Sequence, residues 1–262
     1  MKRIVQALLV GAAVAASSAH AEEVVRIGTL ADYAPFEYRD PSGQLKGMEI
    51  ELGQQMCQHM RVKCQWVTMD FDALIPALKA HKIDAALAQM SVNPERLKTV
   101  DFSRIFTIAP VQYVAKGLTG ISDNPASLRG KTVGVQSGSI HESYLKTRLP
   151  SASSGIEMKV YQGLDQAWLD LQAGRIQAVL ADSTVGLDWI TKEGRKGGFV
   201  LVGKPVSDPE IFGEGTAVAV RKGDARLKAR FDQAIATVLG NGSFAAVNKQ
   251  YFPFSIAPVA AK

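Results

Sequence analysis

One arginine in the sequence has a setting that could bind the carboxylate of a small molecule. Arg96 follows Asn93 and Pro94. Asn is favoured as the N-cap of a helix and Pro at its first position, so Arg96 is predicted to lie in the opening turn of a helix. A cation there opposes the helix dipole unless an anion is near, and a guanidinium beside free N–H groups can bind a carboxylate through two hydrogen bonds. The spacing supports equally well an alternative in which Arg96 is solvated and pairs with Glu95 or Asp101 instead of a ligand.

Four further residues could complete a ligand site or serve only the fold. Asp182 ends the apolar segment AVLAD, and Ser139 precedes a predicted helix in QSGS. Such residues most often cap a helix, although Asp182 could accept an ammonium group and the Ser139 backbone N–H could contact a ligand. Tyr33 and Phe71 lie near predicted strand ends, where aromatic rings usually pack in the core but could also enclose a ligand side chain. When each residue is considered alone, the structural role is the favoured one: a helix cap for Asp182, and core packing for Tyr33 and Phe71.

The sequence has no pattern typical of catalysis or of metal binding. GVQSG lacks the central Ser of a G-x-S-x-G nucleophile elbow, and no glycine-rich phosphate loop is present. The histidines at 20, 59, 81 and 141 have none of the spacings of metal-ligand motifs. We therefore expect binding rather than catalysis, with no catalytic residue, no metal and no cofactor.

A unit of helix and strand occurs twice and sets the position of these residues. DFDALIPALKAHKIDAALAQM (70–90) and GLDQAWLDLQAGRIQAVLADS (163–183) match at an offset of 93 residues. The strand of the first copy ends at Gln89 and that of the second at Asp182. Ligands of open α/β sheets bind outside the carboxyl ends of strands, so two such lobes face to face would form a clamp. The matching pairs are Asp72 with Asp165, Leu78 with Leu171, Ala80 with Ala173, Lys82 with Arg175, Ile83 with Ile176, Ala85 with Ala178, Leu87 with Leu180 and Ala88 with Ala181.

Strands alternate with helices along the chain, which is typical of a parallel sheet covered by helices on both faces. Within the first copy, Asp70 or Asp72 is expected to cap the helix, and Pro76 to kink it or shift its start. In the second copy, Gly174 suits the end of the helix.

The beginning of the chain and its charge predict an exported protein. Lys2 and Arg3 precede the uncharged stretch IVQALLVGAAVAASS and then AHA, the layout of a secretory signal cleaved before Glu22. No later stretch is suited to span a bilayer. Without the signal the formal charge falls from +5 to +3, and no Lys/Arg-rich run indicates nucleic-acid binding. We expect a periplasmic location, no membrane span and no nucleic-acid partner.

Cys57 and Cys64 are the two cysteines of the chain. In an exported protein such a pair indicates one disulfide that closes a small loop, because the compartment is oxidising. The bond would join the end of a predicted helix (48–60) to the next strand. Two buried free thiols are the less favoured alternative.

After the signal, essentially the whole chain resembles the periplasmic solute-binding proteins of polar amino-acid ABC transporters. It is most similar to the lysine/arginine/ornithine and histidine binding group, with opine-binding proteins as near relatives. The resemblance implies an α/β fold of two lobes, the type II periplasmic binding protein fold, with a hinge and a ligand cleft between the lobes. Residues 1–21 would be the signal peptide, 22–109 and 214–262 the first lobe, and 110–213 the second. The segments that carry the resemblance are RIGT, YAPFEY, GMEIELGQQMCQHMRVKCQWV, DFDALIPALKAHKIDAAL, MSVNPERLKTVDFS, GVQSGS, LQAGRIQAVLAD and FGEGTAVAVRKGDARLKARFDQAI.

The resemblance also implies a role for each candidate residue. Arg96 would hold the α-carboxylate of an amino acid, and Asp182 its α-ammonium group. Ser91 and the backbone N–H of Ser139 would add contacts to the carboxylate. The other matching positions are the aromatic pair Tyr33 and Phe71, the cleft residues Ala88, Gln89, Gln136 and Ile140, and the disulfide partners Cys57 and Cys64.

Several positions depart from the lysine/arginine pattern. Leu30 stands where those proteins carry an acidic residue for the distal cation. Its loss removes a charge-assisted contact of about 1.5 to 3 kcal/mol. Glu37, Asp32 or Glu49 could supply the missing charge. The remaining departures are Ala88 and Gln89 in place of two serines, and Gln136, Ile140 and His141.

From these residues we expect capture of a polar, cationic L-amino acid by a monomer that closes around it and presents it to the permease and ATPase of an ABC transporter. Gln89 with Gln136 could instead favour an amide amino acid or an opine. An enzyme on the same fold, such as a dehydratase of prephenate-like substrates, would need a general acid in the cleft. The sensing module of a receptor is a third alternative, disfavoured because no membrane span follows the signal.

Overall fold

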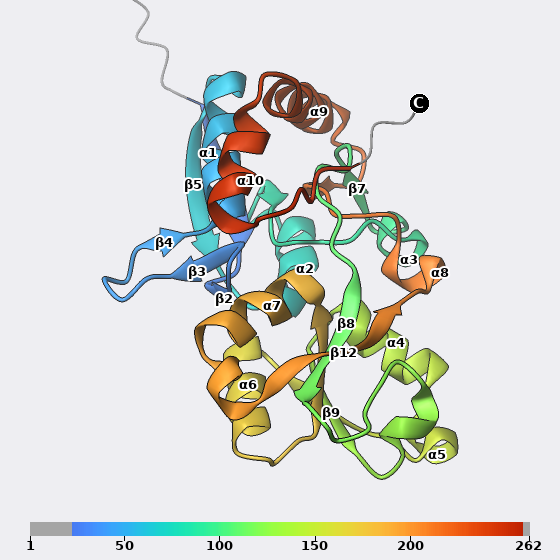
Figure 1. Cartoon of the computed structure of the whole chain (residues 1–262). Coiled ribbons are helices and arrows are strands. Elements are labelled where there is room, and N and C mark those ends of the chain that lie inside the picture. Colours follow the sequence, from blue (N-terminus) through green and yellow to red (C-terminus); the bar gives the residue numbers. More distant parts are fainter. Residues whose placement is uncertain (1–22, 259–262) are drawn as a thin grey trace, which may run out of the picture.

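The computed structural model describes residues 23–258 and has two α/β lobes, one above the other in Figure 1. The two-lobed fold implied by the sequence is confirmed. The predicted signal peptide at residues 1–21 lies outside the described residues. Within residues 23–258, no helix combines the length and apolar character needed to cross a membrane.

The first lobe contains segments from both ends of the chain. Its strands are β1 (Val24–Thr29), β2 (Asp32–Tyr33), β3 (Glu37–Arg39), β4 (Leu45–Lys46), β5 (Lys63–Thr68), β6 (Ala85–Ala86), β7 (Val100–Phe102) and β13 (Ala219–Arg221). Its helices are α1 (Met48–Met60), η1 (Phe71–Ala73), α2 (Leu74–Lys79), α3 (Pro94–Leu97), α9 (Ala225–Gly240) and α10 (Ser243–Tyr251). The main sheet has the order β5-β1-β6-β13-β7, and β2, β3 and β4 form a separate small sheet.

The second lobe is one continuous stretch of chain. Its strands are β8 (Val111–Lys116), β9 (Thr132–Gln136), β10 (Glu157–Tyr161), β11 (Ala178–Asp182) and β12 (Phe199–Val206), in the order β10-β9-β11-β8-β12. Its helices are η2 (Pro125–Leu128), α4 (Ile140–Arg148), α5 (Ser151–Ser154), α6 (Leu164–Gln172), α7 (Ser183–Lys192), η3 (Gly194–Gly197) and α8 (Pro209–Phe212). Trp168 of α6 stacks on Trp189 of α7 with their ring centroids 4.7 Å apart.

The sheets are mixed rather than purely parallel. β1 runs parallel to β5 and β6, and β9 runs parallel to β10 and β11. β13 is antiparallel to β6, and β8 is antiparallel to β11. Both antiparallel strands begin after the chain has crossed from the other lobe, so they enter their sheets from the opposite side. The alternation of elements predicted the parallel part of each sheet but not these strands.

Two segments connect the lobes, residues 103–110 and 207–218. They meet near Thr216, which forms isolated β-bridges with Ser91 and with Thr107. The side-chain oxygen of Gln89 accepts hydrogen bonds from the hydroxyls of Thr107 (3.0 Å) and Thr216 (2.6 Å). Gln89, at the end of the first repeat copy, is therefore hydrogen-bonded to both segments that connect the lobes. The lobe boundaries at 109/110 and 213/214 stay a prediction.

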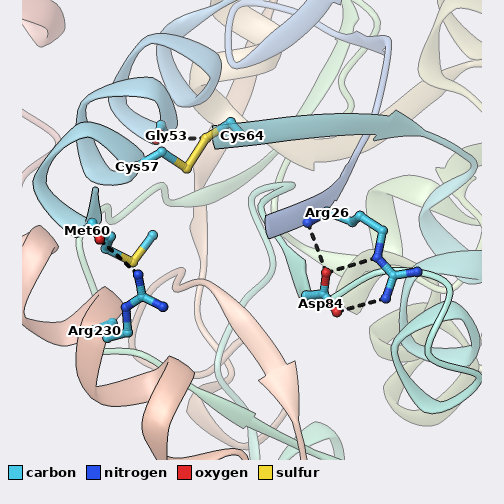
Figure 2. Close-up of a disulfide and its surroundings, with 7 residues drawn as sticks. All are labelled: Arg26, Gly53, Cys57, Met60, Cys64, Asp84 and Arg230. Atoms are coloured by element: carbon cyan, nitrogen blue, oxygen red, sulfur yellow. Dashed lines mark hydrogen bonds and ion pairs between the residues drawn. A yellow bond between two sulfur atoms is a disulfide. The ribbon is translucent and has the colours of Figure 1, made fainter. Parts of the chain in front are cut away.

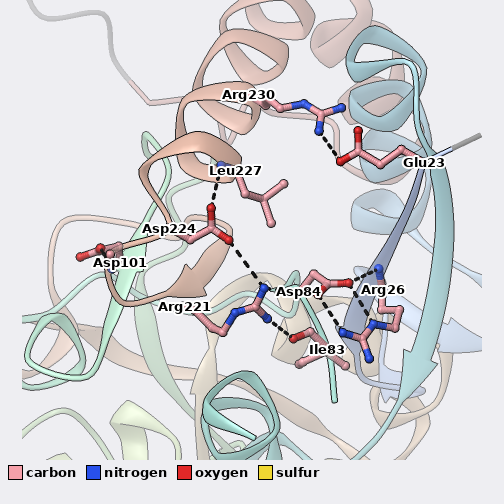
Figure 3. Close-up of polar contacts among 10 residues, drawn as sticks. Glu23, Arg26, Ile83, Asp84, Asp101, Arg221, Asp224, Leu227 and Arg230 are labelled. Carbon is pink, nitrogen blue, oxygen red and sulfur yellow. Dashed lines mark hydrogen bonds and ion pairs between the residues drawn. The ribbon is translucent and has the colours of Figure 1, made fainter. Parts of the chain in front are cut away.

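An ion-pair cluster joins the N- and C-terminal parts of the first lobe (Figure 3). Asp84, just before β6, pairs with Arg26 of β1 at 2.9 Å and with Arg221 of β13 at 3.4 Å. Burial raises the pKa of Asp84, but hydrogen bonds from Arg26 outweigh burial and hold this pKa below its ordinary value. The cluster stabilises a sheet whose strands lie far apart in the sequence.

The predicted disulfide between Cys57 and Cys64 is present and joins α1 to β5 (Figure 2). Near the same end of α1, the Arg230 guanidinium of α9 donates a hydrogen bond to the Met60 carbonyl at 2.8 Å. Its other terminal nitrogen pairs with Glu23 at 2.7 Å. The end of α1 is therefore held by one covalent bond and by a hydrogen bond from α9.

The helix of the first repeat copy starts later than the helix of the second. α2 begins at Leu74 after the short turn η1, so Pro76 lies in the first helical turn, where its missing N–H is tolerated. The predicted shift of the helix start is thus confirmed. The predicted cap at Asp70 or Asp72 is wrong, because neither side chain caps the helix. The Asp72 carboxylate accepts a hydrogen bond from the other lobe instead.

Candidate functional site

A small cavity between the lobes is lined by all ten cleft residues that the sequence singled out, together with His141. The cavity measures about 10 Å³, room for about one water molecule at most. A ligand the size of an amino acid therefore enters only when the lobes separate, and it replaces direct contacts between them. The lining residues are Tyr33, Phe71, Ala88, Gln89, Ser91, Arg96, Gln136, Ser139, Ile140, His141 and Asp182.

Arg96 reaches this cavity from the first turn of α3. The predicted cap is present, because the Asn93 side chain accepts a hydrogen bond from the Arg96 backbone N–H at 2.9 Å. The guanidinium donates to the Ser91 carbonyl at 3.0 Å and, across the cleft, to the Gly138 carbonyl at 3.2 Å. It also lies over the Phe71 ring, 5.1 Å from the centroid.

Arg96 carries a positive charge that no carboxylate in residues 23–258 pairs with. The alternative partners are occupied elsewhere, because Glu95 pairs with Lys98 at 2.6 Å and Asp101 with Lys222 at 2.7 Å. Burial lowers the pKa of Arg96 to about 10, so the group stays charged at neutral pH. The alternative of a solvated Arg96 paired with Glu95 or Asp101, which the spacing left open, is therefore excluded, and the buried charge can receive an anion.

Asp182 faces Arg96 from the second lobe at the end of β11. It stands at the N-cap position of α7, but its side chain makes no capping hydrogen bond. Its Oδ2 accepts a hydrogen bond from the Tyr33 hydroxyl at 2.9 Å, and its Oδ1 lies 3.4 Å from His141 Nε2. The capping role that the residue alone favoured is therefore wrong, and the carboxylate points into the cleft.

Ser139 has the structural role that its position suggested. Its hydroxyl accepts a hydrogen bond from the Glu142 N–H at 3.1 Å and caps α4, and it donates to the Gln136 carbonyl at 2.6 Å. Its backbone N–H makes only a longer contact of 3.3 Å to the same carbonyl. A ligand carboxylate could replace that contact, so the predicted use of this N–H stays a prediction.

Two glutamine side chains leave polar atoms unpaired in the cavity wall. The Nε2 atoms of Gln89 and Gln136 are buried without a hydrogen-bond partner in the described part of the chain. Since buried donors are rarely left unpaired, each is available to an acceptor atom of a ligand.

The three residues proposed to replace the missing acid at Leu30 lie in two places. Glu37 and Glu49 are almost completely buried (0% and 1% exposed), and Glu49 accepts a hydrogen bond from the Gln89 backbone N–H at 2.8 Å. Asp32 lies instead at the mouth of the cleft, in a separate pocket that also contains Asp165. Burial raises the pKa of Asp32 to about 6, with a smaller contribution from Asp165.

The sequence did not indicate a direct contact between the lobes beside the cavity. The Ser137 hydroxyl donates to the Asp72 carboxylate at 2.8 Å. Gly138 has a φ of +70°, and a Cβ atom there would lie 2.9 Å from the Cβ and 3.0 Å from the Cα of Asp72. This close approach requires glycine. The only signal in the sequence was the S-G pair of QSGS, and its partner Asp72 could not be identified from it.

Cavity size alone does not identify the ligand site, because two larger pockets of about 370 Å³ each lie elsewhere, one of them beside Asp32. A pocket of about 370 Å³ on the second lobe is lined by the apolar side chains Ile121, Leu171, Ile176 and Phe199 with Lys116 and Lys131. It presents no carboxylate among its lining residues. Buried charges of opposite sign converge only at the small inter-lobe cavity among the pockets described, so we place the ligand site there.

The fold and the cleft together define a two-lobed solute-binding protein. Residues 25–254 match the bacterial extracellular solute-binding proteins, family 3. The chain belongs to this family.

Relatives of known name lie within the same family. The chain is 40% identical over 236 residues to the L-arginine-binding protein of Pseudomonas aeruginosa, covering 90% of each chain. It is 40% identical over 259 residues to the lysine/arginine/ornithine-binding periplasmic protein of Escherichia coli, covering 98% of this chain and 99% of the other. Among solved structures, an ancestral arginine-binding protein bound to arginine aligns with a TM-score of 0.81 and 33% identity, over 89% of this chain and all of the other. These relatives are binding proteins, and so is this chain.

Proposed function

We propose that the protein captures an L-amino acid with a cationic side chain, of the arginine, lysine, ornithine and histidine class, between its two lobes. The observation that carries the proposal is that Arg96 and Asp182 come from opposite lobes and face one cavity. An α-carboxylate can pair with the guanidinium, and an α-ammonium group with the carboxylate. Because neither lobe alone supplies both charges, the ligand is bound most tightly when the lobes are together, which selects the closed form.

The contacts between the lobes support this reading. Tyr33 of the first lobe donates to Asp182, and Arg96 donates to Gly138 of the second. A zwitterion would take over both contacts with charge-assisted hydrogen bonds, which are about twice as strong as neutral ones. The aromatic rings of Tyr33 and Phe71 would then enclose the ligand side chain.

An amide amino acid such as glutamine is the second candidate. The unpaired Nε2 atoms of Gln89 and Gln136 favour it, because they can donate to the carbonyl of a side-chain amide. An opine is disfavoured, since its second carboxylate would need another cation. Among residues 23–258, Arg96 is the only Lys or Arg that lines the cavity or the pocket at the crossing segments. Arg39 and Lys192 line the pocket beside Asp32, but five carboxyl groups line it with them.

We further propose that the protein acts in the periplasm after cleavage of the signal peptide at residues 1–21. The closed form would be a monomer that docks onto the permease of an ABC transporter, whose ATPase drives import. The predicted boundaries, with residues 22–109 and 214–262 in one lobe and 110–213 in the other, give each lobe its own five-stranded sheet. Family membership and the periplasmic relative support this proposal.

Isothermal titration calorimetry with arginine, lysine, ornithine, histidine, glutamine, citrulline and octopine tests the ligand class. Wild-type protein should bind at least one basic amino acid. R96M, which removes the guanidinium but keeps an unbranched apolar side chain, should weaken that binding at least a hundredfold, because it removes charge-assisted hydrogen bonds of about 1.5 to 3 kcal/mol each. R104M, at an exposed arginine outside the cavity, is the matched control. Absence of heat with every ligand in the panel would contradict the proposal.

A further inference from the structure

Two buried glutamates, Glu37 of β3 and Glu49 of α1, lie directly behind the ligand cavity. Glu49 Oε2 accepts from the backbone N–H of Gln89, a residue of the cavity wall. Glu37 is the cross-strand partner of Tyr33, another residue of that wall. Cross-strand partners have side chains on the same face of a sheet. The pair therefore lies behind Tyr33 and Gln89.

The two carboxyl groups have hydrogen-bonding capacity that the described protein does not use. Both oxygens of Glu37 and Oε1 of Glu49 are buried and receive no hydrogen bond from any other group within residues 23–258, although the two carboxyl groups can hydrogen-bond to each other when one of them is protonated. The salt bridges of that part of the chain include neither residue. A single shared proton pairs only one oxygen of each carboxyl group, and buried acceptors that stay unpaired destabilise the protein. An added cationic donor would remove this destabilisation.

The surroundings of the pair are acidic. Facing groups are Asp32 and Tyr33 of β2 and Asp182 at the end of β11. Burial raises the pKa of Glu37 well above its ordinary value, and the facing Glu49 raises it further. Burial also raises the pKa of Glu49 to about 7. Near neutral pH the two carboxyl groups therefore hold at least one proton between them.

We propose that Glu37 and Glu49 are the specificity-determining residues for the distal end of the ligand, and that a cationic side chain binds there with release of a proton from the pair to solvent. The inference rests on the proposed function and refines it. In the protonated state the pair can donate a hydrogen bond to a neutral amide or urea group. A guanidinium or ammonium group requires the ionised state, so its binding displaces a proton, whereas binding of a neutral ligand does not.

The comparison of arginine with citrulline isolates this end of the ligand. Citrulline has nearly the same shape but a neutral urea group, and both ligands carry the same α-carboxylate and α-ammonium groups. The ratio of arginine affinity to citrulline affinity should rise by up to tenfold per pH unit wherever the pair is protonated, and level off above that range. Titrations of the full chain from pH 5.5 to 8.5, in two buffers of different ionisation heat, should give release of up to one proton per arginine and none specific to citrulline.

Three variants locate the source of the proton. E49Q should lower the affinity for arginine at least tenfold at pH 8 and leave citrulline binding within about threefold. E37Q should abolish the proton release. E51Q, on the same helix and hydrogen-bonded to Tyr251, is the matched control. D32N removes the partly buried carboxyl group of Asp32, which also faces the pair, and should preserve the proton release. Circular dichroism and melting curves check that each variant is folded.

The wild-type buffer series needs no variant and decides the proposal by itself. A pH-independent arginine-to-citrulline ratio without proton release would overturn it, even if both ligands bind tightly. Proton release that persists in E37Q and E49Q but disappears in D32N would also overturn it, by assigning the proton to the mouth of the cleft. If neither ligand nor any other amino acid gives heat, the proposed function itself fails, a result that differs from binding without proton release.

Discussion

The two copies of the repeated unit build the same scaffold but end in different ways. In the first copy the strand β6 is only two residues long, and the chain turns at Gln89, which has a φ of 46°. In the second copy β11 continues for five residues to Asp182. Gln89 holds the hydroxyls of both crossing segments, whereas Asp182 presents a carboxylate to the cleft.

The difference separates two tasks that a clamp needs. In the proposed function, one lobe would fix the two segments that connect the lobes, and the other would carry the charge that meets the ligand. A positive φ is uncommon for a residue other than glycine, so the turn at Gln89 is held in place by its surroundings. The shared packing inside the copies shows that the divergence is confined to their ends.

The largest expected effect comes from changing the charged end of the second copy. D182N should lower the affinity for a basic amino acid about a hundredfold or more, because removing one partner of a buried charge pair costs about 2 to 5 kcal/mol. Its melting temperature should change little, since Asp182 caps no helix. Q89L, the equivalent change in the first copy, should instead lower the free energy of unfolding by about 1 to 3 kcal/mol, since it removes the shared acceptor of the Thr107 and Thr216 hydroxyls and leaves them only each other as partners.

Calorimetry and urea unfolding on both variants separate these effects. If D182N destabilised the protein as much as Q89L while ligand affinity stayed intact, the assignment of the two ends would be wrong. D188N is the matched control, because Asp188 lies on α7 near Asp182 in the chain and pairs with Lys192 rather than facing the cavity.

A smaller effect tests the shared interior of the two copies. A Cβ atom at Gly28 would lie 2.5 Å from Ile83 Cδ1, and one at Gly134 would lie 2.7 Å from Ile176 Cδ1. Ile83 and Ile176 are equivalent in the repeat, so each lobe packs an isoleucine onto a glycine of a neighbouring strand. G28A and G134A should each lower the free energy of unfolding by about 1 to 3 kcal/mol, as overpacked cores do.

Double variants check the cause of that loss. Replacing the facing isoleucine by valine removes the Cδ1 atom, so I83V should restore part of the stability lost in G28A, and I176V should do the same for G134A. A double-mutant cycle in urea measures this coupling. Purely additive effects in both lobes would show that the contact with isoleucine is not the cause.

Much of the scaffold follows from local sequence signals. The repeat predicted one helix and one strand in each lobe, Asn93 with Pro94 predicted the start of α3, and Gly174 follows the end of α6 with a φ of +72°. These features depend on residues a few positions apart. The sequence also predicted which residues line the cleft, because the resemblance covered the whole chain.

The remaining features depend on contacts between distant segments. The pairing of Gln89 with Thr107 and Thr216 requires that both crossings pass the same strand end. The burial of Glu37 beside Glu49 requires a small sheet to pack on α1. Nothing in the sequence indicated these contacts. In particular, it did not indicate that Glu37 and Glu49 are buried, since an isolated glutamate in a sequence is usually solvated.

The smallest expected effect concerns the surface of the two copies, where Arg175 is equivalent to Lys82. Arg175 pairs with Asp170 at 2.6 Å, but its side chain is 60% exposed, and Lys159 and Tyr161 contact the same carboxylate. Exposed ion pairs contribute about 0 to 1 kcal/mol, and Asp170 keeps two partners when Arg175 is removed. R175A should therefore lower the free energy of unfolding by less than about 1 kcal/mol, an effect that rising salt reduces further. K82A, where the structure records no ion pair within residues 23–258, is the matched control and should change stability less. A loss in R175A as large as that in G134A would mean that the surface of the second copy contributes as much stability as its interior.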